Sequence, residues 1–229
     1  MYKHVFLDFD DTIYDTRGNS NIALQELYEH FNLNRFFDRF DLFSEIYWKR
    51  NHEVWALYSQ GKMTRQELIV ERFLYPLQQA GTGSVEMALE LSDWFLDRTA
   101  QKSGLIAGAV ELLDYLKPNY HLHVISNGFT EVQYRKMKSA GVDGYFEEII
   151  LSEAVGVNKP DPAIFEYALQ KAGAQATESI MIGDNFDTDI VGAIGSKIDQ
   201  VFFNPKEDFI APVSPTYEVR SLREIKHIL

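Results

Sequence analysis

The sequence contains no cysteine, no dense run of lysine or arginine, and no long apolar segment. The absence of cysteine excludes thiol catalysis, disulfides and cysteine-ligated zinc. Lysine and arginine number 22 against 34 aspartates and glutamates, for a formal net charge of −12. Polymeric nucleic acid is therefore disfavoured as a partner, because backbone phosphates are bound by clustered positive charge. With neither a membrane span nor a recognisable signal peptide, we expect a cytoplasmic protein.

Short β-branched and aromatic runs alternate with helical patterns in most of the chain. The 229 residues, 45% of them hydrophobic, suffice for a substantial core. Strands are predicted at residues 5–7, 122–125, 148–151, 179–182 and 201–203. Helices are predicted at residues 110–116, 130–140, from 162 onward and 187–195. This alternation predicts an α/β fold, a Rossmann-like parallel sheet with helices on both faces.

Residues 21–102 have a different pattern, in which periodic apolar and aromatic residues indicate helices without intervening strands. The helices are predicted at about 21–32, 38–59, 64–79 and 84–101. Thr64 and Glu67 have the spacing of a capping box. We therefore expect an all-helical domain at 16–104, inserted into an α/β core formed by 1–15 and 105–229.

Polar residues follow three of the predicted strands at the point where each strand ends. Asp8, Ser126 and Asp184 occupy these positions. In open parallel sheets, ligands bind beyond the carboxyl ends of the strands, so these residues should converge. The segment Ser126-Asn127-Gly128 precedes a helix, whose N-terminus could bind an anion, and Lys159 offers a positive charge for phosphate. Taken alone, each is better explained as a turn, a cap or an exposed loop residue.

Four aspartates are candidates for a metal site: Asp8, Asp10, Asp184 and Asp189. Any one of them alone would be interpreted as a turn residue or a helix cap. A cluster of carboxylates is different, because their mutual repulsion is relieved when a cation lies between them. With only oxygen ligands available, a hard cation is expected, and Mg²⁺ fits best.

The chain resembles the haloacid dehalogenase-like (HAD) hydrolases over essentially its full length. Residues 8–12, DFDDT, match the D-x-D-x-T motif, with Asp at position 11 where many relatives have Gly. Ser126 and Lys159 match the second and third motifs by position, and Gly183-Asp184 with Asp189 matches the fourth. The helical insertion is similar to the C1 cap of this family, with hinges expected near 15–19 and 103–108.

The resemblance implies a mechanism. Asp8 would be the nucleophile that forms an aspartyl-phosphate, and Asp10 would protonate the leaving group and then activate water. Mg²⁺ would be held by Asp8, the carbonyl of Asp10 and Asp184, with Asp189, or alternatively Asp187, in support. The remaining catalytic and substrate-binding residues would be Ser126, Asn127 and Lys159. As an acid at neutral pH, Asp10 requires a raised pKa, which its crowded surroundings could supply.

The expected activity is Mg²⁺-dependent hydrolysis of a small phosphate monoester. Motif one and the Ser126 segment are similar to those of 5′-nucleotidases, so a nucleoside monophosphate is the expected substrate. Phosphoglycolate and sugar phosphates are alternatives, as is a phosphatase of broad specificity. A metal-independent 2-haloacid dehalogenase, which has the same fold, is another alternative. Such enzymes lack an acid two residues after the nucleophile, so the presence of Asp10 argues against this reaction. A non-catalytic binding module and a receiver-type phosphoacceptor domain are further alternatives. The oligomeric state and the cap residues that contact substrate are not predicted.

Overall fold

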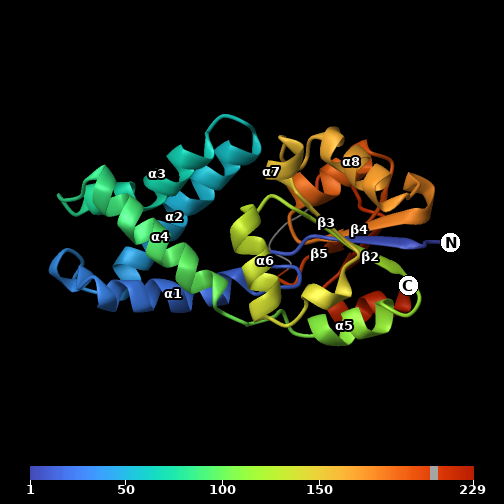
Figure 1. The fold of residues 1–229 in the computed structure, drawn as a ribbon, viewed down its shortest axis with the longest axis horizontal. Coiled ribbons are helices and arrows are strands. Elements are labelled where there is room, and N and C mark those ends of the chain that lie inside the picture. Colours follow the sequence, from blue (N-terminus) through green and yellow to red (C-terminus); the bar gives the residue numbers. More distant parts are fainter. Residues whose placement is uncertain (207–210) are drawn as a thin grey trace. The chain divides into compact units, whose positions relative to one another are not determined.

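The computed structural model describes residues 1–206 and 211–229, which form two compact units (Figure 1). One unit comprises Met1–Thr16 and Ser103–Leu229, and the other comprises Arg17–Lys102. The sequence-based division places the corresponding changes after residues 15 and 104. No helix in the described ranges is long and apolar enough to cross a membrane.

The first unit contains a six-stranded parallel sheet with the strand order β3-β2-β1-β4-β5-β6. The strands are β1 (His4–Leu7), β2 (His121–Ser126), β3 (Glu148–Leu151), β4 (Ser179–Gly183), β5 (Asp199–Phe203) and β6 (Tyr217–Val219). The chain adds β2 and β3 on one side of β1 and then crosses to add β4 on the other side. A crevice at such a reversal is where open α/β sheets bind ligands.

Helices cover both faces of this sheet, as the alternating pattern predicts. They are α5 (Ala109–Leu116), α6 (Thr130–Ser139), α7 (Ser152–Val155), α8 (Pro162–Ala172) and α9 (Val191–Gly195), with 3₁₀ turns at Asp143–Tyr145, Ala176–Glu178 and Leu222–His227. In Figure 1, α7 and α8 lie on one side of the strands and α5 on the other. Val5 and Leu7 enter the core beneath α5, whereas Phe6 enters the core beneath α8. The predicted α/β class is confirmed.

The local signal at the start of α8 is confirmed, and the helix that follows β4 differs from the prediction. Asp161 caps α8 through a bond from the backbone N–H of Ala163, with Pro162 in the first turn. The regular helix predicted at 187–195 begins instead as a π-helix, Phe186–Ile190, before α9. The side chain of Asn185 accepts bonds from the N–H groups of the first turn of this π-helix.

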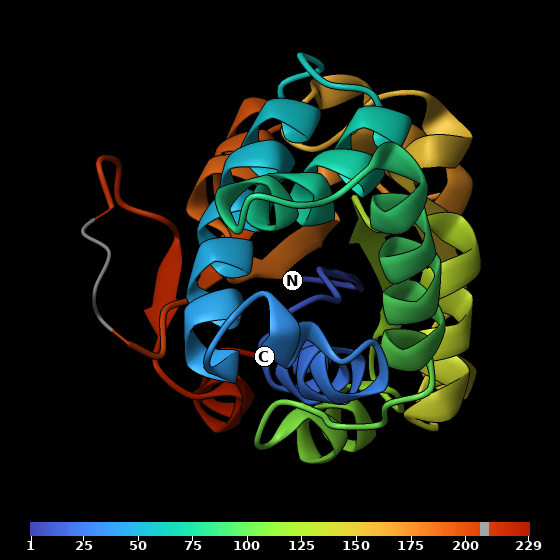
Figure 2. The ribbon, with the colours of Figure 1, turned by 90° about the vertical axis from the view of Figure 1, so that its left-hand side faces the viewer.

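The second unit is entirely helical, and its helices run from blue to green in Figure 2. They are α1 (Thr16–His30), a 3₁₀ turn at Leu33–Arg35, α2 (Phe40–Ser59), α3 (Arg65–Gln79) and α4 (Val85–Ala100). The predicted capping box of Thr64 and Glu67 is present at the start of α3. Helix α1 begins five residues earlier than predicted. The residues buried in its first turns include the polar Asn19 and Ser20, so an apolar pattern does not mark this start. Aromatic side chains, including Phe43, Tyr47 and Phe73, form much of this unit's core.

A histidine in β2 makes the stability of the first unit dependent on pH. His123 is 1% exposed, and its ring packs against those of His4 and Phe6. Burial lowers the pKa of His123 to about 4. The neighbouring His4 lowers it further, and the negative charge of Glu147 raises it by less. The folded protein therefore resists a proton that the unfolded chain accepts below its ordinary pKa of about 6.5.

We expect the contribution of His123 to the free energy of unfolding to fall as the pH drops from about 6.5 towards 4. The lowered pKa of His123 should account for on the order of 1–2 kcal/mol between pH 7 and 5. Urea unfolding at several pH values measures this change. Because Asp8 and Asp184 have raised pKa values and act in the opposite direction, the test is the difference between two proteins: as the pH falls through this window, His123→Gln should gain stability relative to the wild type. An identical pH dependence in both proteins would contradict the prediction.

Candidate active site

Three polar residues meet at the carboxyl edge of the sheet because their strands are neighbours. Asp8 directly follows β1, Ser126 ends β2, and Asp184 directly follows β4. Strand β1 lies between β2 and β4, and the backbone N–H of Asp8 bonds to the carbonyl of Ile182 at 2.8 Å. The structure thus brings to one edge of the sheet three residues that are between 58 and 176 positions apart in the chain.

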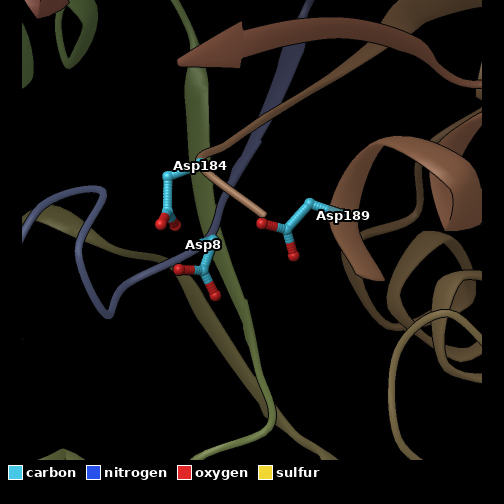
Figure 3. A group of neighbouring side chains, drawn as sticks. All are labelled: Asp8, Asp184 and Asp189. Carbon is cyan, nitrogen blue, oxygen red and sulfur yellow. The ribbon is translucent and has the colours of Figure 1, made fainter. Parts of the chain in front are cut away.

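Asp8, Asp184 and Asp189 form an acidic cluster in which each contributes an oxygen within 4.8 Å of the others (Figure 3). Burial raises the pKa of Asp8 to about 7, and Asp189 and Asp10 add to this against the opposing charge of Lys159. Burial also raises the pKa of Asp184 well above its ordinary value, reinforced by Asp8 and Asp189. Three crowded carboxylates and no softer ligand fit a hard divalent cation.

Lys159 is the cation of this cluster, and only 2% of its side chain is exposed. Its ammonium group lies 2.5 Å from Oδ1 of Asp8 and 2.8 Å from Oδ1 of Asp189. Burial alone would lower the pKa of Lys159, but the two carboxylates outweigh it and the net shift is upward. Lys159 is therefore charged at neutral pH and directly faces the oxygen of Asp8.

Asn127 fixes the backbone that carries Lys159. Its Nδ2 donates to the carbonyl of Lys159 at 3.0 Å, and its Oδ1 accepts from the N–H of Lys159 at 2.8 Å. The two bonds use both ends of the amide side chain. Asn127 was predicted from the sequence as a substrate-binding residue, and in this structure its polar atoms bind the Lys159 loop.

The first and fourth motifs contact each other through Thr12, a fully buried residue. The hydroxyl of Thr12 donates to Oδ1 of Asp184 at 3.0 Å and accepts from the backbone N–H of Asp184 at 3.1 Å. Gly183 is required at its position because a Cβ there would overlap the carboxylate of Asp189. The role of Thr12 could have been found from its place in D-x-D-x-T, but the contact itself depends on strand order.

The backbone conformation at position 11 explains why Asp can replace the Gly that many relatives have there. Asp11 adopts φ +59°, in the left-handed region that glycine favours. Aspartate is among the few other residues that populate this region readily. The substitution of Asp for Gly is therefore compatible with the same tight turn after β1.

Asp10 is held by three donors, none of which the sequence motifs predict. Lys136 Nζ and Gln133 Nε2 each lie 2.6 Å from a carboxylate oxygen of Asp10, and Thr16 Oγ1 lies 2.5 Å away. Burial would raise the pKa of Asp10, but the charge of Lys136 and these hydrogen bonds outweigh it and lower the pKa. The expectation that the crowded surroundings of Asp10 raise its pKa was wrong, because those surroundings include the charge of Lys136 and three hydrogen-bond donors.

Ser126 is buried at the end of β2, and its hydroxyl oxygen accepts two hydrogen bonds. The backbone N–H of Gly128 donates at 3.1 Å and Gln133 Nε2 donates at 2.7 Å. A hydroxyl oxygen has two lone pairs, so its hydrogen remains to be donated elsewhere.

Of the two acids left open for metal support, Asp189 is 1% exposed and in the cluster, whereas Asp187 is exposed.

Comparison with known proteins identifies the family. Residues 2–196 match the family model described as haloacid dehalogenase-like hydrolase. The chain belongs to this family. The HAD-hydrolase YfnB of Bacillus subtilis is 31% identical over 231 residues, which is 100% of this chain and 95% of that protein. A crystal structure of YfnB bound to magnesium superposes with a TM-score of 0.90 at 30% identity, covering 99% of this chain and 98% of YfnB.

Other HAD relatives are named phosphatases. The pyrimidine 5′-nucleotidase YjjG of Escherichia coli is 28% identical, covering 98% of this chain and 96% of YjjG. The glyceraldehyde 3-phosphate phosphatase of Methanothermobacter thermautotrophicus is 29% identical, covering 89% of this chain and 86% of that enzyme. The chain is accordingly a HAD-type phosphatase.

Proposed function

We propose that this HAD-type phosphatase is a Mg²⁺-dependent hydrolase that transfers phosphate to Asp8, with nucleoside monophosphates as its substrate class. The observation that carries the proposal is that Asp8 is paired with a charged Lys159 and has a carboxylate oxygen within 4.8 Å of oxygens of Asp184 and Asp189. Phosphoryl transfer depends mainly on positioning and on offsetting negative charge, and this arrangement supplies both.

Asp8, Asp184 and Asp189, with the main-chain carbonyl of Asp10, would hold Mg²⁺. When bound, the ion would offset charge on the phosphoryl oxygens and relieve the repulsion among the carboxylates. The acidic cluster fits this role because it offers only oxygen ligands, two after the neighbouring strands β1 and β4 and one from the π-helix that follows β4. The magnesium in the YfnB crystal structure supports the choice of ion.

The protein's own groups would divide the reaction into two displacements at phosphorus. A carboxylate oxygen of Asp8 would attack, while Asp10 delivers a proton to the departing oxygen of the ester. Because Lys136 lowers the pKa of Asp10 in the protein alone, Asp10 would take up that proton only when the negative phosphate group is bound beside it. Water would then attack the phosphorus of the aspartyl-phosphate, giving its proton to Asp10 and releasing phosphate and the free Asp8. Ser126 and Lys159 would bind phosphoryl oxygens, with Ser126 donating the hydrogen that its two accepted bonds leave available.

The substrate class rests on the relatives, one of which is named a pyrimidine 5′-nucleotidase. The named glyceraldehyde 3-phosphate phosphatase supports the alternative of a sugar-phosphate substrate. A metal-independent dehalogenase is less favoured because Asp10 and the acidic cluster are both present. A small-molecule phosphate ester as partner and a cytoplasmic location are part of the same proposal.

The experiment that tests the function is phosphate release from a panel of monoesters with Mg²⁺, with EDTA as the control. The panel contains pyrimidine and purine nucleoside monophosphates, phosphoglycolate and triose and hexose phosphates. A kcat/KM well above the rest for nucleotides supports the substrate class. Equal rates would reject it while leaving the phosphatase reaction, and no hydrolysis of any ester with Mg²⁺ would reject the reaction itself.

The two aspartates left open by the sequence should behave differently towards Mg²⁺. Asp189 lies in the acidic cluster, whereas Asp187 is exposed, so Asp189→Asn should raise the Mg²⁺ concentration for half-maximal activity by about 10–100-fold. Asp187→Asn serves as the matched variant, with the same chemical change two residues away, and should titrate like the wild type. Titrations of phosphatase activity measure both, and the reverse order would contradict the assignment.

A further inference from the structure

Two buried side chains of α6 that belong to none of the family motifs contact Asp10. Gln133 is fully buried and Lys136 is 7% exposed. Gln133 Nε2 donates to Oδ2 of Asp10 and Lys136 Nζ donates to Oδ1, each at 2.6 Å. Burial of an amide and an ammonium group is costly unless their polar atoms are paired. Both pairings here are directed to the same carboxylate.

The two residues share the buried face of α6, which differs from the face exposed to solvent. A spacing of three residues places Gln133 and Lys136 side by side on a helix. Lys136 also lies over the ring of Tyr14, with its Nζ 5.2 Å from the ring centroid. Tyr134 and Lys138, which alternate with them along the helix, are exposed. A lysine on α6 therefore has two distinct environments, one against Asp10 and one in solvent.

Gln133 also connects Asp10 to the end of β2. The same Nε2 that donates to Asp10 donates to the hydroxyl of Ser126 at 2.7 Å. The amide thereby fixes the spacing between the proposed proton donor and the proposed phosphoryl ligand.

We infer that Gln133 and Lys136 are positioning residues that orient the Asp10 carboxylate towards the leaving-group oxygen. This inference rests on the proposed function, in which Asp10 protonates that oxygen. Neither residue needs to touch the substrate, because each acts through Asp10. Their loss should therefore slow the departure of a poor leaving group, which needs the proton, more than that of a good one, which departs as a stable anion.

The test compares two aryl esters in the presence of Mg²⁺: phenyl phosphate, a poor leaving group, and dinitrophenyl phosphate, a good one. For Gln133→Leu and Lys136→Met, kcat on phenyl phosphate should fall about 10–100-fold, and kcat on dinitrophenyl phosphate less than about 3-fold. KM should change little for either ester. The ratio of the two rates does not depend on how much of a variant is folded, so a partly unfolded sample remains informative.

Three further variants sharpen the result. Lys138→Met makes the same change on the exposed face of α6 and should leave both rates unchanged. Lys136→Arg keeps a charged donor and should recover part of the loss on phenyl phosphate. Gly128→Ala displaces the Gln133 side chain without removing it and should reproduce the Gln133→Leu pattern.

The contrary outcomes are distinct from one another. Equal losses on both esters would reduce Gln133 and Lys136 to structural residues, and unchanged rates on both would remove any role; either overturns the inference but leaves the phosphatase activity in place. A wild-type enzyme that is inert towards both esters with Mg²⁺ would instead reject the proposed function, and the inference with it.

Discussion

The variant Asp8→Asn should lose at least about 10⁴-fold in Mg²⁺-dependent phosphatase turnover, because it removes the attacking oxygen. Asparagine has nearly the same shape, so the fold around the strand end should persist. The change also removes one buried carboxylate from a cluster in which burial and neighbouring acids already raise the pKa of Asp8 to about 7. We therefore expect thermal stability equal to the wild type or higher, together with the loss of activity.

Two measurements separate this role from a purely structural one. Acid quenching of the wild type during turnover, followed by mass spectrometry, should show one added phosphoryl group on the peptide that contains Asp8, and none in Asp8→Asn. Asp143→Asn, the same change at an exposed position in a short 3₁₀ turn, should retain wild-type turnover. An Asp8→Asn enzyme with turnover comparable to the wild type would remove Asp8 as nucleophile.

The convergence of Asp8, Ser126 and Asp184 could be predicted because strands leave a strong local signal. Each of these residues interrupts an apolar run, and parallel strands end at the same edge of a sheet. Which strands are neighbours is a long-range property that no local pattern specifies. The structure places β1 between β2 and β4, and only this order allows Thr12 to bond Asp184.

The partners of Asp10 could not be predicted, for a physical reason that lies in the sequence of α6. Residues 130–139, TEVQYRKMKS, are mostly polar and read as a helix exposed to solvent over most of its surface. Gln133 and Lys136 nevertheless point inward because Asp10 offers them a half-buried carboxylate, a tertiary contact that outweighs local preference. The same omission explains why the pKa of Asp10 was expected to rise when Lys136 lowers it.

The C-terminal strand was missed because it is short and poorly covered. Strand β6 has three residues, of which only Val219 is buried. A run of this length lacks the alternation from which strands are recognised. Its pairing with β5 is again a tertiary effect, and it lies at the edge of the sheet, away from the proposed site.

The variant Lys159→Met should lose both stability and activity, and Mg²⁺ should restore only the first. Without Lys159, Asp8 and Asp189 lose the cation that lies 2.5 and 2.8 Å from them in a buried site. Removing one partner of a buried ion pair typically costs about 3–5 kcal/mol. In EDTA at neutral pH, we expect Tm to fall by about 10 °C, as measured by thermal unfolding. Lys171→Met, at an exposed position on α8, should unfold like the wild type.

Added Mg²⁺ should separate the loss of stability from the loss of activity, because the positive charge in the site both neutralises the acids and assists phosphoryl transfer. A divalent cation bound by Asp8, Asp184 and Asp189 would offset their repulsion, so Mg²⁺ should raise the Tm of Lys159→Met more than that of the wild type. It cannot replace the ammonium group that faces the Asp8 oxygen, so turnover at saturating Mg²⁺ should stay about 10²–10³-fold low. Equal Tm values in EDTA would show that Lys159 does not neutralise the cluster, and wild-type turnover with Mg²⁺ would show that it does not assist phosphoryl transfer.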